Sequence, residues 1–98
     1  MSFQSSDISL LVNAGLTISQ AKIYLTLVLN GKQTIKFIAK LSGVDRSNTY
    51  REIMKLEELA LVKKIIGIPN MFQAISLAGA ISLLLAERQK QCEKTKKA

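Results

Sequence analysis

The chain has 98 residues, the size of one domain, and a chain of this length buries roughly 60 to 65% of its extended surface. Fourteen Lys and Arg against seven Asp and Glu give a net charge of +7, which favours a polyanionic partner such as nucleic acid. The chain has no His and one Cys, so it cannot assemble a zinc site or a Ser-His or Cys-His dyad. We therefore expect no enzyme activity, no metal and no cofactor.

Targeting and membrane segments are not expected either. The first seven residues lack the basic region and the long apolar run of a secretory signal. The longest apolar-rich run, 77–86, is interrupted by Gly79 and Ser82 and is too short to span a bilayer. A single cysteine fits a cytoplasmic protein without membrane contact, in which Cys92 is a free thiol. An intersubunit disulfide through Cys92 is the alternative.

Three helices are expected in the first part of the chain. Apolar residues recur at helical spacing over 7–14, and a glycine follows. The second helix, 17–30, begins with a capping box formed by Thr17 and Gln20. A short third helix over 34–41 precedes a turn that contains glycine.

The stretch 45–60 predicts a longer helix with two distinct faces. Thr49, Ile53 and Leu56 fall on one side, at the spacing of a buried stripe. Asp45 stands where an N-cap acceptor is needed. Taken alone, this stretch is also typical of an ordinary amphipathic surface helix. A short helix, a glycine-containing turn and a second helix with a polar outer face, however, are typical of a helix-turn-helix.

The pattern after this helix changes from helical to extended. Two β-rich runs over 61–75 surround the turn Gly67-Ile68-Pro69-Asn70 and predict a hairpin, which in this position is a wing. Because the tip has no cation, we expect weak wing contact with DNA, or contact through Asn70. A last helix is expected over 76–93. The predicted fold class is α+β and mainly helical: one winged helix-turn-helix domain over 1–98, with a two-stranded wing and a C-terminal dimerisation helix.

Several short motifs, in order, resemble one known family. They are Gly15-Leu16-Thr17 before Ala21-Lys22-Ile23-Tyr24-Leu25, the run 38–44, Arg46-Ser47 with Tyr50, Leu56-Glu57-Glu58 before Leu61-Val62, and the wing pattern of Gly67, Pro69, Phe72 and Ala74. Together they resemble the DNA-binding domain of the TrmB-like archaeal transcriptional regulators, within the winged-helix group that includes the MarR-type repressors. The resemblance covers about residues 10–87. It implies a dimeric transcription regulator from an archaeon or from an archaeal virus or plasmid.

The chain departs from the family pattern at three points. Asp45 stands where the family usually has Pro, which changes the cap and not the helix start. Ala60 stands where the family usually has Gly, so we expect a less sharply turned helix exit, because alanine resists positive φ. Most members carry a sugar-sensing domain after the last helix, and none is found in this sequence, so the resemblance does not predict a sugar response. The effector is unknown.

Candidate DNA contacts follow from the helix-turn-helix and the wing. The expected base-reading residues are Ser47, Asn48 and Arg51, since Arg pairs naturally with guanine and Asn with adenine. The expected backbone contacts are Thr34, Lys36, Arg46, Tyr50, Lys55, Lys63, Lys64 and Asn70. Lys63 and Lys64 alternate along a strand and cannot both face DNA. Tyr50 is equally expected to pack against the core.

The last helix is apolar over more than one face, which indicates a partner surface. The expected dimer interface comprises Leu77, Ile81, Leu84, Leu85 and Arg88. The alternative is that these leucines only close the core of the monomer. We predict a homodimeric, sequence-preferring regulator that binds double-stranded DNA. Two alternatives remain: an abundant chromosome-coating protein, and a winged helix of the transcription machinery that binds protein and not DNA.

Overall fold

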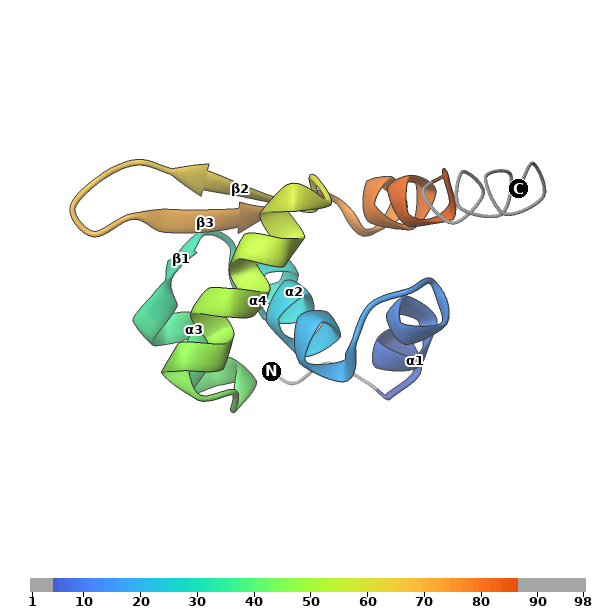
Figure 1. Ribbon diagram of the computed structural model, residues 1–98, viewed down its shortest axis with the longest axis horizontal. Coiled ribbons are helices and arrows are strands. Elements are labelled where there is room, and N and C mark those ends of the chain that lie inside the picture. The colour runs from blue at the N-terminus through green and yellow to red at the C-terminus, as the bar shows by residue number, and fades with distance from the viewer. Residues whose placement is uncertain (1–4, 87–98) are drawn as a thin grey trace, which may run out of the picture.

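The computed structural model describes residues 5–86 and has the winged-helix architecture that the sequence predicts (Figure 1). The described elements are, in chain order, α1 (Ser5–Asn13), α2 (Ile18–Asn30), β1 (Gln33–Thr34), α3 (Ile35–Ser42), α4 (Arg46–Glu58), β2 (Val62–Ile65), β3 (Met71–Ala74) and a terminal helix over 77–86. The predicted fold class, mainly helical α+β, is confirmed.

Side chains at the helix starts supply the hydrogen bonds that the first turns need. The backbone N–H of Gln20 donates to Thr17 Oγ1 (3.1 Å), and the backbone N–H of Thr17 donates to Gln20 Oε1 (3.0 Å), which completes the predicted capping box. Asp45 Oδ2 accepts from the Asn48 N–H at the start of α4 (3.3 Å). Ser76 Oγ accepts from the Gly79 N–H at the start of the terminal helix (3.2 Å). Local sequence therefore fixes where these helices begin.

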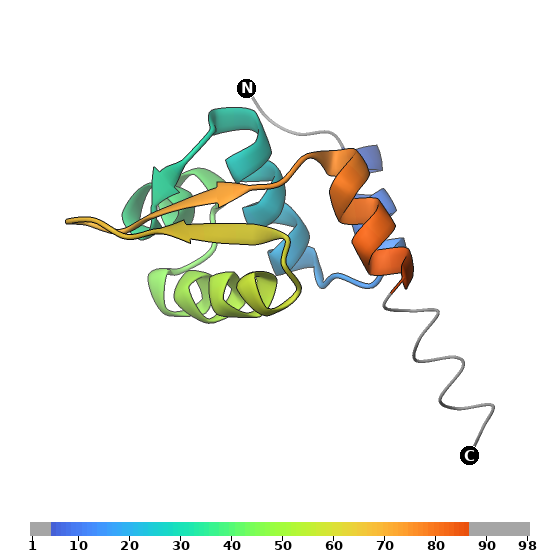
Figure 2. The ribbon, with the colours of Figure 1, turned by 90° about the horizontal axis from the view of Figure 1, so that it is seen from above.

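The core is built around α2, which lies at the centre of the domain (Figures 1 and 2). Ile23, Tyr24 and Leu27 are almost fully buried, and α1, α3 and α4 all pack against this helix. The Tyr24 hydroxyl donates a hydrogen bond to the Ile75 carbonyl oxygen at 2.6 Å, which ties α2 to the segment after β3. Burial raises the pKa of Tyr24 to about 12.

β2 and β3 form the predicted hairpin of the wing, and β1, which was not predicted, adds a third strand to give an antiparallel sheet in the order β1-β3-β2. Gln33 pairs with Phe72, and Thr34 pairs with Met71. The two-residue strand β1 was missed because it is too short to show an alternating pattern and its partner lies far along the chain. This pairing joins the start of α3 to the wing, so the helix-turn-helix and the hairpin are held together.

The exit from α4 differs from the prediction in length and in geometry. The helix ends at Glu58, two residues before the predicted end at 60. Ala60 has φ 65, in the left-handed region, so the expectation of a less sharply turned exit is wrong. The Leu61 N–H then donates to the Leu56 carbonyl oxygen at 3.0 Å. Alanine makes the turn that glycine usually makes, at a cost of roughly 1 to 2 kcal/mol.

The terminal helix lies at the same end of the domain as α1 (Figures 1 and 2) and contributes to the monomer core. Ala80 and Leu84 are buried, Leu77 and Ile81 are half-buried, and Leu83 and Leu85 are exposed. Leu84 therefore belongs to the core of the monomer, which is the alternative that the sequence left open for it, and the dimer interface stays a prediction. Arg88 and Cys92 lie outside the described residues.

Candidate nucleic-acid interface

The inner face of α4 fixes the helix against the domain. Thr49, Ile53 and Leu56 are 0%, 1% and 0% exposed, and the Thr49 hydroxyl donates to the Val44 carbonyl oxygen at 3.2 Å. A helix held by a fully buried stripe and a side-chain hydrogen bond cannot rotate about its axis. Its outer face is therefore presented to solvent in one defined orientation.

Ser47 and Arg51 are exposed on this outer face, as the helical pattern predicts. Met54 lies on the same face, three residues after Arg51, and is 51% exposed. Met54 was not among the predicted contacts, because an apolar residue in an amphipathic helix is expected on the buried face. Its spacing from Tyr50 and Arg51, one turn apart from each, was the signal that could have placed it outside. An exposed methionine here can contact a thymine methyl group.

Asn48 lies on the flank of this face and is held by the helix cap. Its backbone N–H and its side-chain amide both donate to the carboxylate of Asp45. Two-point recognition of adenine needs the amide nitrogen and oxygen of an asparagine. Asn48 must therefore share or exchange its side-chain bond to Asp45 before it can contact a base in this way.

Lys55, a predicted backbone contact, is tied to its own helix. Its Nζ lies 3.7 Å from Glu52 Oε1, and Glu52 Oε2 also accepts from the Thr17 hydroxyl at 3.2 Å. Lys55 remains 56% exposed. Glu52 is 13% exposed, but the lysine end of the pair lies in solvent and the separation is long, so the pair contributes about 1 kcal/mol and a DNA phosphate can compete with Glu52 for this lysine.

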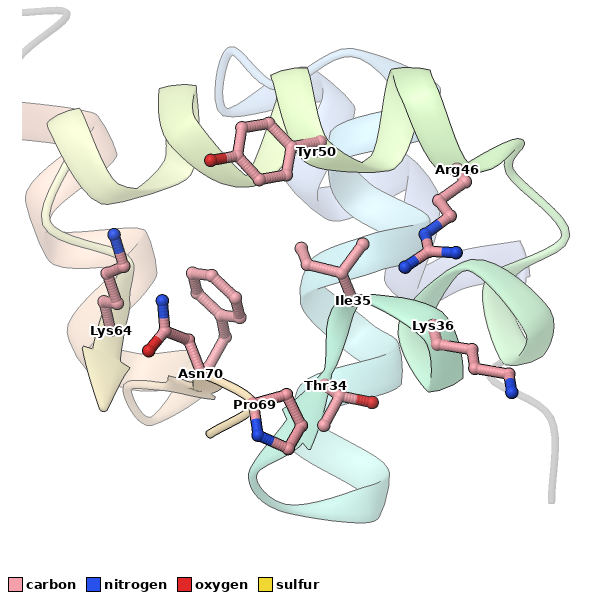
Figure 3. A pocket seen from close by; sticks show the side chains of 9 residues that line it. Thr34, Ile35, Lys36, Arg46, Tyr50, Lys64, Pro69 and Asn70 are labelled. Carbon is pink, nitrogen blue, oxygen red and sulfur yellow. The ribbon is translucent and has the colours of Figure 1, made fainter. Parts of the chain in front are cut away.

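A pocket of about 390 Å³ lies between the start of α3, the N-terminal half of α4 and the wing (Figure 3). Six of the residues that line it are predicted backbone contacts: Thr34, Lys36, Arg46, Tyr50, Lys64 and Asn70. The other three, Ile35, Pro69 and Phe72, are apolar and were missed. Nothing in the sequence showed that three segments so far apart would enclose one space.

The two wing lysines lie on opposite faces of the sheet. Lys64 is paired with Phe72, which lines the pocket, so its side chain is on the same side. Lys63 is paired with Gln73 on the other face. Both lysines are exposed, but only Lys64 shares a surface with α4.

Asn70 closes the wing turn and also faces the pocket (Figure 3). Its Oδ1 accepts from the Gly67 N–H at 2.9 Å, so the oxygen is used within the turn. Two other residues of the wing tip, Ile66 and Ile68, are 87% and 105% exposed. The wing tip is thus apolar as well as uncharged.

The described residues hold no group of three or more Cys, Asp or Glu that could bind a metal ion. Within the same part of the chain, no helix has the length and apolar character needed to cross a membrane.

The buried inner stripe of α4, its exposed polar face and the attached wing define a winged helix-turn-helix of the DNA-binding class. The family model "Sugar-specific transcriptional regulator TrmB" matches residues 10–78, and the chain belongs to this family. A search of curated protein sequences found no match.

Solved structures show the same fold. TrmBL2, an archaeal chromatin protein, has a TM-score of 0.84 and 22% identity over 94% of this chain; the match covers 37% of TrmBL2. The MarR family regulator SPO1453 from Silicibacter pomeroyi has a TM-score of 0.63 and 21% identity, over 89% of this chain and 65% of that one. The Zα domain of Carassius auratus PKZ, solved in complex with Z-DNA, has 28% identity and a TM-score of 0.56, over 58% of this chain and 92% of that domain.

Proposed function

We propose that this chain is a sequence-preferring transcriptional regulator that binds double-stranded DNA as a homodimer. The observation that carries the proposal is the outer face of α4, where Ser47 and Arg51 are exposed on a helix that Ile53 and Leu56 fix in orientation. Family membership supports transcription regulation, and the Zα structure supports contact between this fold and duplex DNA.

Arg46, Lys36 and Lys64 supply positive charge on one side of this helix, around the pocket. In this proposal α4 enters the major groove, and these cations contact the phosphates beside it. Lys63, on the opposite face of the sheet, does not take part. Dimerisation uses the exposed leucines of the terminal helix, Leu83 and Leu85, in place of Leu84.

Salt dependence of DNA binding tests the proposal. A plot of log K against log salt should fall with a slope of roughly −4 to −8 for a dimer, because each neutralised phosphate releases a counterion. Lys64→Gln should reduce the slope by about one unit per subunit, and the matched control Lys63→Gln should leave it unchanged. A slope near zero, or an equal effect of both variants, would contradict the proposed contacts.

A chromosome-coating role is the second candidate, and the structural similarity to TrmBL2 favours it. Footprinting separates the two functions. A regulator protects discrete sites, whereas a coating protein protects DNA continuously. A third candidate, a winged helix that binds protein and never DNA, predicts that Arg51→Ala changes no DNA affinity.

A further inference from the structure

The wing tip, residues 66–70, carries the two most exposed large apolar side chains of the described residues. Ile68 is 105% exposed and Ile66 is 87% exposed, whereas the next in order, Ile18, is 59% exposed. Burial of an isoleucine side chain is favourable, yet both tip isoleucines stand in water. The tip therefore presents apolar surface that the domain itself leaves uncovered.

The strands behind the tip hold it in a defined position. β2 and β3 pair as far as Ile65 and Met71, so only residues 66–70 form the turn. Within the turn, the Gly67 N–H donates to Asn70 Oδ1 at 2.9 Å. β3 also pairs with β1, and Phe72 of β3 is 4% exposed and anchors the strand in the core. The tip therefore loses little conformational freedom when it binds a partner.

The wing tip and α4 lie on two sides of one space. Pro69 and Asn70 line the pocket from the wing, and Arg46 and Tyr50 line it from α4 (Figure 3). All charged residues that line the pocket are cations. In the proposed function α4 occupies the major groove and these cations contact the adjoining phosphates. One DNA strand then runs between α4 and the wing, and the groove on the far side of that strand is the minor groove, where the wing tip lies.

The composition of the tip determines what it can do in this groove. The negative potential of a narrow minor groove attracts cations, and the tip has none. Apolar side chains, isoleucine and proline among them, act there as wedges that enter between two base pairs, unstack them in part and bend the duplex. Ile68 is followed directly by Pro69, so two side chains of this kind stand together. Unstacking costs least at the flexible TA and CA/TG steps.

We propose that Ile68 is a wedge that enters the minor groove next to α4 and partly unstacks a base step, with a preference for a TA or CA/TG step. The inference rests on the proposed function, because it requires DNA bound along α4. The wedge gives the protein a second source of sequence preference. This preference depends on the deformability of the DNA, and not on the hydrogen-bonding groups that α4 reads.

The test uses the full chain and a duplex site selected from random DNA. 2-Aminopurine, an adenine analogue whose fluorescence rises when it is unstacked, replaces each adenine of the site in turn. The bound wild-type protein should raise the fluorescence at one step in each half-site. Ile68→Ala should abolish the rise, and Ile68→Leu should keep it, because leucine also acts as a wedge. The matched control Ile18→Ala, at the start of α2, should keep it as well.

Affinity measurements show whether the wedge selects the step. Replacement of the unstacked TA or CA step by AA should raise the Kd of the wild type by roughly threefold to tenfold and leave the Kd of Ile68→Ala nearly unchanged. An equal increase for both proteins would refute selection of the step by Ile68.

The remaining outcomes separate the wedge from the proposed function. If Arg51→Ala lowers affinity for the selected site but no 2-aminopurine responds, or the response survives in Ile68→Ala, the wedge is refuted and the proposed function stands. If the protein binds no duplex DNA, both fail. Ile68→Ala without DNA should sediment as the wild type does. A smaller assembly would assign the tip to a contact between copies of the chain and overturn the wedge.

Discussion

Tyr24→Phe removes one hydroxyl from the centre of the fold and keeps the aromatic ring. Tyr24 is 0% exposed, and its hydroxyl donates to the Ile75 carbonyl oxygen at 2.6 Å. The substitution leaves this carbonyl without its donor, so the free energy of unfolding should fall by about 1 to 2 kcal/mol. Denaturant unfolding monitored by circular dichroism should show a lower midpoint with an unchanged slope.

The same pair makes stability depend on alkaline pH. Burial raises the pKa of Tyr24 from its ordinary value of 10.0 to about 12, so the folded state keeps the phenol protonated where the unfolded state ionises. This contribution is fully present below pH 10 and is lost as the pH rises through 12, and by pH 12 the free energy of unfolding has fallen by about 2 kcal/mol. The stability advantage of the wild type over Tyr24→Phe should therefore disappear between pH 10 and pH 12. Parallel pH curves for the two proteins would refute the assignment.

Two further predictions concern the exit of α4 and the terminal helix. Ala60→Gly should raise the free energy of unfolding by about 0.5 to 1 kcal/mol, because φ 65 strains alanine. The control Ala39→Gly, within α3, should lower the free energy of unfolding by about 1 kcal/mol. Chemical denaturation of both variants measures the difference. Leu85→Glu should yield folded monomers in analytical ultracentrifugation, while Leu84→Glu should unfold the chain, because Leu84 is 5% exposed and Leu85 is 54% exposed. An unchanged Leu85→Glu dimer would place the interface elsewhere.

The parts of the fold that were predicted are those encoded by neighbouring residues. The capping box of Thr17 and Gln20, the cap at Asp45 and the apolar stripe of α4 each act within a few positions of the chain. What was missed depends on distant residues. Strand β1 has two residues and exists because Gln33 and Thr34 meet β3. A pairing between residues so far apart in the chain cannot be predicted from the residues around Gln33 and Thr34.

In the candidate interface, too, the features set by neighbouring residues were predicted and those set by distant residues were not. The exposure of Ser47 and Arg51 follows from helical periodicity alone. The pocket does not, because α3, α4 and the wing must first be brought together before Ile35 and Phe72 face Lys64. The conformation of Ala60 could not be predicted from its residue type. The turn after α4 requires a positive φ at this position, which alanine disfavours.

The most direct test of DNA reading by α4 compares Arg51→Ala with Lys55→Ala. A preferred site is first selected from random DNA, and competition binding then measures both variants against this site and a scrambled one at several salt concentrations. Arg51 lies on the exposed face near the helix start, where side chains reach base edges, whereas Lys55 lies one turn further along and is paired with Glu52.

Arg51→Ala should cost about 1 to 3 kcal/mol on the preferred site and leave scrambled DNA nearly unaffected, so the ratio of the two affinities collapses. Lys55→Ala should weaken both DNAs alike and lower the salt slope by about one unit per subunit. If Arg51→Ala weakens the preferred and scrambled DNAs equally, α4 does not read bases through Arg51, and the chromosome-coating function becomes the better account.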